Sequence, residues 1–454
     1  MFMGVMVVNA ENILTTSAVG SMAEFGTLET ETNYITVCQS GCDFDSLDDA
    51  LTNIEEENTS GLYFGDNAGV DTVAIDIKDN RTYKIGDHIL LARVGIYTSI
   101  ENNVINIDGE GSTIINYFGL GFLGEPYISK VQVYTLSKLN LKNLKIYSNW
   151  NAELFFYNIR EFTLDNVEII NLAREFLAEA IENSEIAMES QSSMVGLRIV
   201  DCGKQTIKNS KIEGFTLGIV SDRFDDVPFT DFTATIDNSD LHNNFLSMEV
   251  DNERENDNLE YNIINSKLTS ILAVNSTVNV DKSNKIVNDL TLYETDPNTG
   301  EEVVKDIIKR NVKSCTFEEL AGSMDYNFLA SNTMYLTTEN GKINFTNEDS
   351  AMKGDTTKDL SELFPMDNTV EYSYAFDDNS IAKIVNGKIV GLKKGTTTLT
   401  VTDPNTNVTY RLTVNIDDVT NPNTSKSAII VMLVFIISTS LLMTRFIKTA
   451  KEAR

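Results

Sequence analysis

The stretch Leu141-Lys-Asn-Leu-Lys-Ile146 decides how the larger part of this 454-residue chain folds, because the chain repeats its pattern. Each copy has an apolar residue two positions before an Asn and another apolar residue three positions after it. The other copies are Leu164-Asp-Asn-Val-Glu-Ile169, Ile207-Lys-Asn-Ser-Lys-Ile212, Ile236-Asp-Asn-Ser-Asp-Leu241 and the looser Ile263-Ile-Asn-Ser-Lys-Leu268. Independent surface turns would not need these flanking apolar residues, so the pattern indicates a repeated structural unit.

The five Asn residues give the period of the repeat. They stand at positions 143, 166, 209, 238 and 265, so the steps are 23, 43, 29 and 27 residues. A period in the twenties with a short strand before a fixed Asn is typical of stacked β coils. The step of 43 corresponds either to two coils or to one coil with an insertion. Asn tolerates a left-handed bend, and stacked Asn amides can form a ladder, so we expect buried Asn bends in a solenoid.

The repeated region resembles the pectin-lyase-like right-handed parallel β-helix. Ile105-Asn-Ile-Asp-Gly-Glu-Gly-Ser-Thr-Ile114 looks like an early coil of that family, in which a strand turns at Asp-Gly and resumes after Gly111. Residues 42–54 look like its N-terminal capping helix, with Asp45 or Ser46 as the N-cap. The helix is expected to bury one apolar stripe, formed by Leu47, Ala50, Leu51 and Ile54.

Residues 346–417 carry a second resemblance, to a bacterial immunoglobulin-like domain of group 2. The residues that carry it are Val370 to Tyr374, Asp377 to Ile384, Asn386 to Gly395 and Thr396 to Val401. Short alternating segments such as Leu412-Thr-Val-Asn-Ile416 predict strands of a small β-sandwich. Asn386-Gly387 predicts a type I′ hairpin turn. In that family such a module most often serves as a spacer on surface proteins.

Two other segments predict helices or strands with less regularity. Residues 173–185 have helical propensity and fall inside the 43-residue step, so they indicate an insertion. Residues 301–345 are interpreted as a C-terminal cap and connector, with a helix capped by Thr316 and a strand over residues 332–338. The chain is thus expected to be all-β, with a solenoid over residues 26–300 preceded by a leader at residues 1–25.

The end of the chain has the composition of a membrane anchor. Residues 428–444 contain no charged residue, and the tail 445–454 carries four basic residues against one acidic residue. Such a segment predicts a transmembrane helix with a cytoplasmic tail and an extracellular bulk. The linker 418–427 resembles a cell-wall sorting signal of the Asn-Pro type, which implies attachment to peptidoglycan. The residues of that motif are Asn421, Pro422, Asn423, Thr424 and Ser425, and a plain linker is the alternative.

Composition limits the partners of the protein. The chain has 67 acidic and 36 basic residues and a net charge of −31. Nucleic-acid binding is therefore excluded, because phosphate contacts need a basic surface. Export makes a Cys38–Cys42 disulfide an alternative to two reduced thiols, whereas Cys202 and Cys315 are too isolated in the sequence to assign as a pair.

Two classes of function compete. The sequence favours a non-catalytic, cell-surface protein that displays its solenoid for binding or adhesion to a glycan or protein ligand. The alternative is a carbohydrate-active enzyme, either a polysaccharide lyase or a glycoside hydrolase, because many β-helix proteins of the resembled family cleave acidic polysaccharides. No family motif identifies a catalytic site, and no cofactor is expected apart from Ca²⁺.

Candidate residues for chemistry are few. Arg223, Asp225 and Asp226 bring one base and two carboxylates together on an expected coil loop. The densest carboxylate cluster, Asp251, Glu253, Glu255 and Asp257, is a candidate Ca²⁺ site. His242, His88 and Trp150 are interpreted as a loop residue, a strand-edge residue and a packed aromatic residue.

Overall fold

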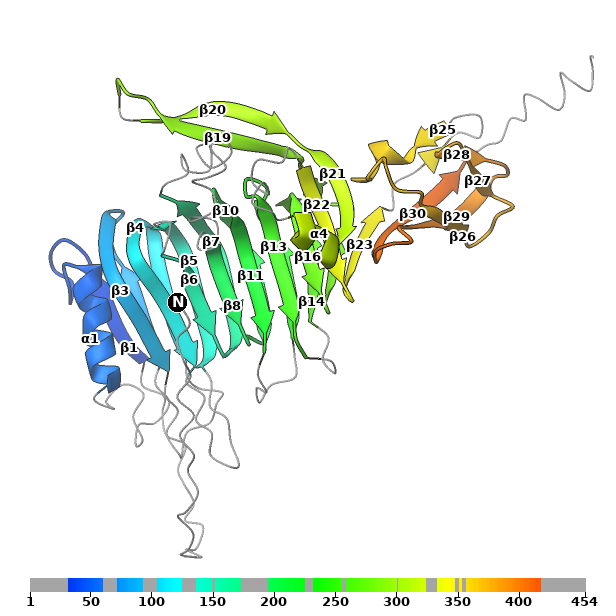
Figure 1. Cartoon of the computed structure of the whole chain (residues 1–454). Coiled ribbons are helices and arrows are strands. Elements are labelled where there is room, and N and C mark those ends of the chain that lie inside the picture. The colour runs from blue at the N-terminus through cyan, green and yellow to red at the C-terminus, as the bar shows by residue number, and fades with distance from the viewer. Residues whose placement is uncertain are drawn as a thin grey trace, which may run out of the picture.

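A computed structural model describes twelve ranges of the chain: 32–59, 72–92, 104–124, 136–148, 152–172, 195–224, 232–254, 259–299, 301–323, 333–347, 351–352 and 357–417. In these ranges the coils of a parallel β solenoid stack side by side and are followed by a small β-sandwich (Figure 1). The prediction of a β-rich solenoid is thereby confirmed. The leader 1–25, the linker and sorting motif 418–427 and the apolar segment 428–444 lie outside the described ranges.

Each coil contributes strands to three faces, and strands on one face pair in parallel from coil to coil. The first face, before the Asn bend, consists of β1 (Thr32–Val37), β2 (Thr72–Ile77), β9 (Lys204–Lys208), β12 (Thr233–Asp237), β14 (Glu260–Ile264), β17 (Thr277–Val280) and β23 (Lys342–Asn347). The second face, after the bend, includes β10 (Lys211–Glu213), β15 (Lys267–Leu268) and β18 (Lys285–Ile286). Four long strands turn corners between faces: β3 (Thr82–Ala92), β4 (Val104–Gly124), β5 (Leu136–Ser148) and β7 (Ile159–Asn171).

The third face, called the front face below, consists mainly of short strands. They are β6 (Leu154–Tyr157), β8 (Val195–Val200), β11 (Leu217–Arg223), β13 (Leu246–Asn252), β16 (Ser270–Val274), β22 (Thr333–Glu339) and the terminal β21 (Asn311–Thr316). The last part of β4, from Leu120 to Leu123, pairs with β6, and β6 pairs with β8, so the face is continuous across these coils (Figure 1).

Stacked apolar side chains fill the interior of the solenoid. On the first face, Leu141 pairs with Leu164, which pairs with Ile207, and all three are at most 1% exposed. Phe156 packs edge-to-face against Phe122 and Phe162, at centroid distances of 5.7 and 5.0 Å. The apolar residues that flank each Asn in the sequence therefore form the core columns, as the repeat predicts.

The five Asn bends adopt the predicted left-handed conformation, with φ between 47° and 58°. Asn166 donates to Oδ1 of Asn143 at 3.0 Å, and Asn238 donates to Oδ1 of Asn209 at 2.8 Å. Asn143, Asn209 and Asn265 instead donate to carboxylates of Asp108, Asp165 and Asp237, so the ladder alternates between amides and carboxylates.

The expectation of buried Asn bends is wrong. Four of the five Asn residues are exposed, and the residue after the bend is the one that turns inward. Ser210, Ser239 and Ser266 are at most 4% exposed. The backbone N–H of Ser210 donates to Oγ of Ser239 at 3.2 Å, and that of Ser239 donates to Oγ of Ser266 at 3.0 Å. These hydroxyl groups satisfy buried backbone donors, which exposed Asn amides cannot reach.

The cause of the Asn preference can be tested at Asn238. Replacement by Leu should lower the free energy of unfolding by about 1–2 kcal/mol, because a branched side chain is strained at positive φ. Replacement by Gly removes the amide but not the conformation, so Asn238→Gly should unfold in urea close to the parent protein. Equal destabilisation by Gly and Leu would contradict this and assign the effect to the ladder.

The N-terminal cap agrees with the prediction. Helix α1 (Leu47–Thr59) begins after Ser46, whose Oγ accepts a hydrogen bond from the Asp49 N–H at 3.3 Å. Of the two predicted N-caps, Ser46 is therefore the one used. The four predicted apolar residues of the helix are at most 2% exposed, and the helix covers the end of the solenoid (Figure 1). The bend of the early coil also lies as expected, with positive φ at Glu110 and Gly111.

The 43-residue step is one coil with an insertion, because β7 pairs directly with β9, with Glu161 opposite Lys204. The insertion, with the predicted helix at residues 173–185, lies outside the described ranges. Residues 301–345 contribute a further coil rather than only a cap. Thr316 caps α4 (Phe317–Ser323), and β22 coincides with the predicted strand. An unpredicted antiparallel hairpin, β19 (Asp289–Thr295) with β20 (Glu302–Lys309), precedes this coil.

The sandwich is joined to the solenoid through a shared sheet. Its last strand, β30 (Val408–Ile416), pairs in parallel with β23, so the first face continues into the sandwich. Tyr410 stacks on Phe345 at 5.2 Å across this junction. The other elements are β24 (Ala351–Met352), β25 (Thr357–Asp359), η3 (Leu360–Glu362), β26 (Ser373–Phe376), β27 (Ala382–Val385), β28 (Lys388–Gly391) and β29 (Gly395–Thr402). Asn386 and Gly387 have φ of 51° and 73° in the β27–β28 turn, as predicted.

The structure also shows the state of the four cysteines and bears on the predicted membrane helix. Cys38 and Cys42 form a disulfide, whereas Cys202 and Cys315 are buried free thiols. In the described ranges, no helix has both the length and the apolar composition needed to cross a membrane.

Candidate active site

Charged side chains form a cluster on the outer surface of the front face. In β8, β11 and β13 every second residue points into the core, as the buried Leu197, Ile219 and Met248 show. The residues between them point outward, and four of these are charged rather than apolar. They are Arg198 on β8, Asp222 on β11, and Glu249 and Asp251 on β13.

Strand register brings these residues together. Val220 is paired with Arg198 on one side and with Glu249 on the other. Asp222 is paired directly with Asp251, across strands that lie about 4.8 Å apart. Glu249 and Asp251 are two residues apart on one strand, which separates their Cα atoms by about 6.7 Å. Three carboxyl groups therefore share one small area of surface.

Arg198 links this cluster to a fourth carboxylate. Its Nε donates to Oε2 of Glu153 at 2.9 Å, and its Nη1 lies 3.4 Å from Oδ2 of Asp222. The side chain of Asp222 is 12% exposed and that of Arg198 is 29% exposed. Because Arg198 contacts two carboxylates, it holds Asp222 in a defined position beside the other two acids.

Burial and mutual repulsion shift the acidities of these groups. Burial, with repulsion from Asp222 and Asp251, raises the pKa of Glu249 to about 7. Burial also raises the pKa of Asp222 to about 6, although the nearby Arg198 opposes the shift. Burial and the charges of Glu253 and Glu339 raise the pKa of Asp251, whose Oδ1 is buried without a hydrogen-bond partner among the described residues. The pKa values of Asp222 and Glu249 thus lie on either side of a mildly acidic pH.

This arrangement is suited to paired acid–base chemistry. Between pH 6 and 7, Asp222 is mostly ionised and can accept a proton, while Glu249 is mostly protonated and can donate one. Two such carboxyl groups are what hydrolysis of a glycosidic bond requires. Raised pKa values of this kind, together with a charge partner, are also typical of functional sites.

Of the sequence candidates Arg223, Asp225 and Asp226, Arg223 is the one that the described ranges include, and it is not part of this cluster. Arg223 is 3% exposed, and its guanidinium carbon lies 3.0 Å from the centroid of the Phe232 ring. Asp225 and Asp226 lie outside the described ranges, so their role stays a prediction. The neighbour of Arg223, Asp222, is the residue that faces outward.

The spacing of the repeat contains a signal from which the pairing of Asp222 with Asp251 can be predicted. Asp222 stands thirteen residues after Asn209, and Asp251 stands thirteen residues after Asn238. Aligning the coils on their Asn bends therefore predicts that the two Asp residues are neighbours. Glu249 and Arg198 have no such partner in the repeat, and only the strand register brings them to the same surface.

Two of the four Ca²⁺ candidates lie within the described ranges and two lie outside them. Asp251 belongs to the acidic cluster and Glu253 follows β13, whereas Glu255 and Asp257 lie outside the described ranges. Within the described part of the chain, no three His, Cys, Asp or Glu residues are grouped so as to hold a metal ion. Ca²⁺ binding stays a prediction.

The two histidines have structural contacts. His88 is 4% exposed, and its Nε2 lies 2.8 Å from Oδ1 of Asp48 on the capping helix. The ring of His242 bonds to Asp240, which also pairs with Lys267 at 2.8 Å. Although burial opposes it, hydrogen bonds from His242 and Lys267 lower the pKa of Asp240. Trp150 lies outside the described ranges.

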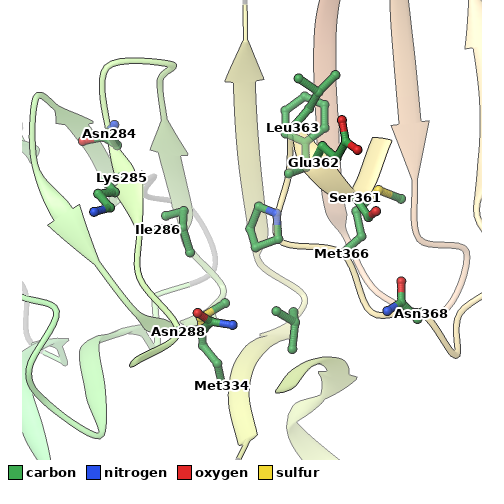
Figure 2. A pocket seen from close by; sticks show the side chains of 13 residues that line it. Asn284, Lys285, Ile286, Asn288, Met334, Ser361, Glu362, Leu363, Met366 and Asn368 are labelled. Carbon is green, nitrogen blue, oxygen red and sulfur yellow. The ribbon is translucent and has the colours of Figure 1, made fainter. Parts of the chain in front are cut away.

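A separate concavity of about 570 Å³ lies between the last coils and the sandwich (Figure 2). Asn284, Lys285 and Ile286 line it from the solenoid, and Leu363 and Met366 line it from the sandwich. Glu362 is the carboxyl residue of this lining, so the concavity brings no pair of acids together. The front face is therefore the stronger candidate for acid–base catalysis.

Comparisons with known proteins give one match. A family model described as the hyaluronate lyase N-terminal beta-sheet domain matches residues 366–414, which form most of the sandwich. The match leaves the solenoid and its acidic cluster outside the aligned residues. Neither a search of curated proteins nor a search of solved structures found a match to the chain.

Proposed function

We propose that this protein is a carbohydrate-active enzyme that hydrolyses glycosidic bonds on the front face of its solenoid. The observation that carries the proposal is the cluster of Asp222, Glu249 and Asp251, with raised pKa values, on adjacent parallel strands. Two carboxyl groups of opposite protonation state are the minimum that this reaction needs.

In this proposal each group of the cluster has a distinct role. Glu249, whose pKa is about 7, donates a proton to the leaving oxygen of the scissile bond. Asp222, whose pKa is about 6, is the ionised partner that acts on the opposite side as base or nucleophile. Arg198 keeps Asp222 oriented through its 3.4 Å contact. Glu249 stays protonated mainly because it is buried, and repulsion from Asp222 and Asp251 adds to this effect.

The family match supports this reading over the adhesion reading that the sequence favours. The matched model belongs to hyaluronate lyases, whose name refers to the cleavage of a polysaccharide. A surface used only for adhesion has no need of clustered carboxyl groups that titrate near neutral pH. Adhesion by the solenoid therefore becomes the second reading rather than the first.

Charge favours hydrolysis over the lyase reaction. A lyase that acts on a polyuronate must neutralise the carboxylate of its substrate, usually with metal ions or free basic residues. Here Arg198 already pairs with Glu153 and Asp222, and the protein has a net charge of −31. An acidic polysaccharide would be repelled from this surface, so a neutral polysaccharide is the better substrate class.

The test is an assay of the full chain against soluble polysaccharides. Galactan, arabinan, xylan, mannan, a mixed-linkage glucan and polygalacturonate would each be incubated with the protein, and reducing ends and unsaturated products would be measured. We expect new reducing ends from a neutral polysaccharide without ultraviolet-absorbing unsaturated products. Unsaturated products from polygalacturonate would establish a lyase instead. If no substrate gave a product, the hydrolase proposal would be refuted and adhesion would become the preferred function.

The pH dependence of the reaction follows from the two pKa values. Activity should rise with pH through about 6 as Asp222 ionises, and fall through about 7 as Glu249 loses its proton. A bell-shaped profile of kcat/KM with a maximum between pH 6 and 7 is therefore expected. A profile that still rises above pH 8 would contradict the assignment of Glu249 as the acid.

The same enzyme is proposed to act outside the cytoplasm. The Cys38–Cys42 disulfide supports this, because such bonds persist in oxidising compartments. The predicted membrane segment, or attachment to peptidoglycan at Thr424, would then hold the solenoid at the cell surface. Protease treatment of intact cells should trim the solenoid if the topology is right.

A further inference from the structure

Two aromatic side chains stand on the front face, on the strand that pairs with the strand of Arg198. Phe155 and Tyr157 alternate on β6 with Leu154 and Phe156, which are fully buried in the core. Alternation along the strand therefore directs Phe155 and Tyr157 outward. Their rings are nearly parallel, at an interplanar angle of 11° and a centroid distance of 6.3 Å.

The register places this pair directly beside the acidic cluster. Phe155 is paired with Arg198, and Tyr157 is paired with Val200, which is in turn paired with Asp222. The aromatic strand is thus two strands from Asp222, a distance of about 10 Å along the solenoid axis. On the other side Phe155 is paired with Gly121, which adds no side chain beside the ring.

Phe155 and Tyr157 are half-buried, and they are not the rings that fill the core of this coil. The core beneath them is filled by Phe156, which packs against Phe122 and Phe162. Parallel aromatic rings on a surface offer apolar area to a ligand that is itself flat and partly apolar. A sugar ring has such a face, formed by its C–H groups, while its hydroxyl groups suit the charged residues next to it.

We propose that Phe155 and Tyr157 form a sugar-binding subsite that receives neutral saccharide units next to the catalytic carboxyl groups. This inference rests on the proposed function for its choice of ligand. The saccharide chain lies along the solenoid axis, with its scissile bond over Asp222 and Glu249. The subsite is on the order of two sugar units from that bond, toward the N-terminal coils.

The subsite can be tested separately from catalysis by affinity gel electrophoresis. The full chain would be run in native gels that contain galactan, arabinan, xylan, mannan, a mixed-linkage glucan or polygalacturonate, each at graded concentration. We expect a neutral polysaccharide to retard the parent protein. Phe155→Ala and Tyr157→Ala should each weaken that retardation by about tenfold in apparent Kd, the scale of one lost aromatic contact.

Further variants separate stacking from a structural effect. Phe155→Trp should keep the retardation, because the aromatic surface remains, whereas Phe155→Leu should lose it although the position stays apolar. Tyr34→Ala, at a 68% exposed tyrosine on the first face, is the matched control and should bind like the parent. Melting temperatures of all variants would confirm that they fold.

The outcomes distinguish the subsite from the hydrolase proposal. Loss of binding in Phe155→Ala without hydrolysis of any substrate would keep the subsite and refute the enzyme. Hydrolysis with an unchanged KM in Phe155→Ala and Tyr157→Ala would refute the subsite and keep the enzyme. No retardation of the parent by any neutral polysaccharide, or equal binding by Phe155→Leu, would also overturn the subsite.

Discussion

Replacement of Glu249 by Gln is expected to lower kcat by about 10²- to 10⁴-fold, because it removes the proton that the leaving group receives. Gln keeps the size and shape of the side chain, so KM should change little. Glu168→Gln, on β7 away from the front face, is the matched control and should retain full kcat. A kcat of Glu249→Gln within twofold of the parent value would refute the assignment of the acid.

The same variant should be more stable than the parent at neutral and alkaline pH. Burial raises the pKa of Glu249 from the ordinary 4.5 to about 7, so the folded protein binds the proton more tightly than the unfolded chain. The stability of the parent therefore decreases as the pH rises through the window from about 4.5 to about 7. Below this window the two proteins should differ little, because Glu249 is protonated in both states.

Urea unfolding at several pH values measures this difference. Above pH 7 the free energy of unfolding of Glu249→Gln should exceed that of the parent by on the order of 2 kcal/mol, after a discount for partial solvent screening. A gain in stability together with a loss of activity is typical of a residue kept for function. A variant less stable than the parent at pH 8 would mean that Glu249 stabilises the fold.

Replacement of Gly341 by Ala should have the largest effect on stability. Gly341 connects β22 to β23 where the chain passes close to the coil below. A Cβ at this position would lie 2.4 Å from the carbonyl oxygen of Ala273 and 2.9 Å from that of Ser276. Both atoms belong to the backbone, so neither can move without disturbing the paired strands of that coil.

We expect Gly341→Ala to lower the free energy of unfolding by about 3 kcal/mol, the upper part of the range for overpacking. Gly86→Ala is the matched control, because its Cβ would meet only a carboxylate oxygen of Asp48 at an ordinary 3.6 Å. That variant should unfold within about 0.5 kcal/mol of the parent. Equal behaviour of the two variants in thermal and urea unfolding would show that the coils can separate at Gly341 without loss of stability.

The repeat of apolar residues around Asn was sufficient to predict the solenoid, its core columns and its left-handed bends. These features depend on local conformation and on the alternation of side chains along a strand, and both are readable from a single sequence. The capping helix, including Ser46 and its apolar stripe, was predictable for the same reason. The burial of the bends was mispredicted at Asn238, because the side chain that reaches the interior is that of the following Ser239.

The acidic cluster was only partly predictable. The density of carboxylates around Asp251 points to this residue in the sequence. Another sequence candidate, Arg223, is the immediate neighbour of the outward-facing Asp222 but is not itself part of the cluster. Successive side chains of a strand point alternately into the core and to the surface. A motif that does not show which residues face outward can therefore select the neighbour of the surface residue. Arg198 and Glu249 have no motif at all in their own segments of sequence.

The sequence by itself determined the architecture, because repeated apolar pairs can be buried only by stacking one coil on the next. Tertiary structure alone brought Arg198 and Glu249 to Asp222 and set the acidity of the two carboxyl groups. Arg198, Asp222 and Glu249 come from three coils, and their contact depends on the register of β8, β11 and β13. Their pKa values depend on burial and on mutual repulsion, which exist only once those strands are side by side.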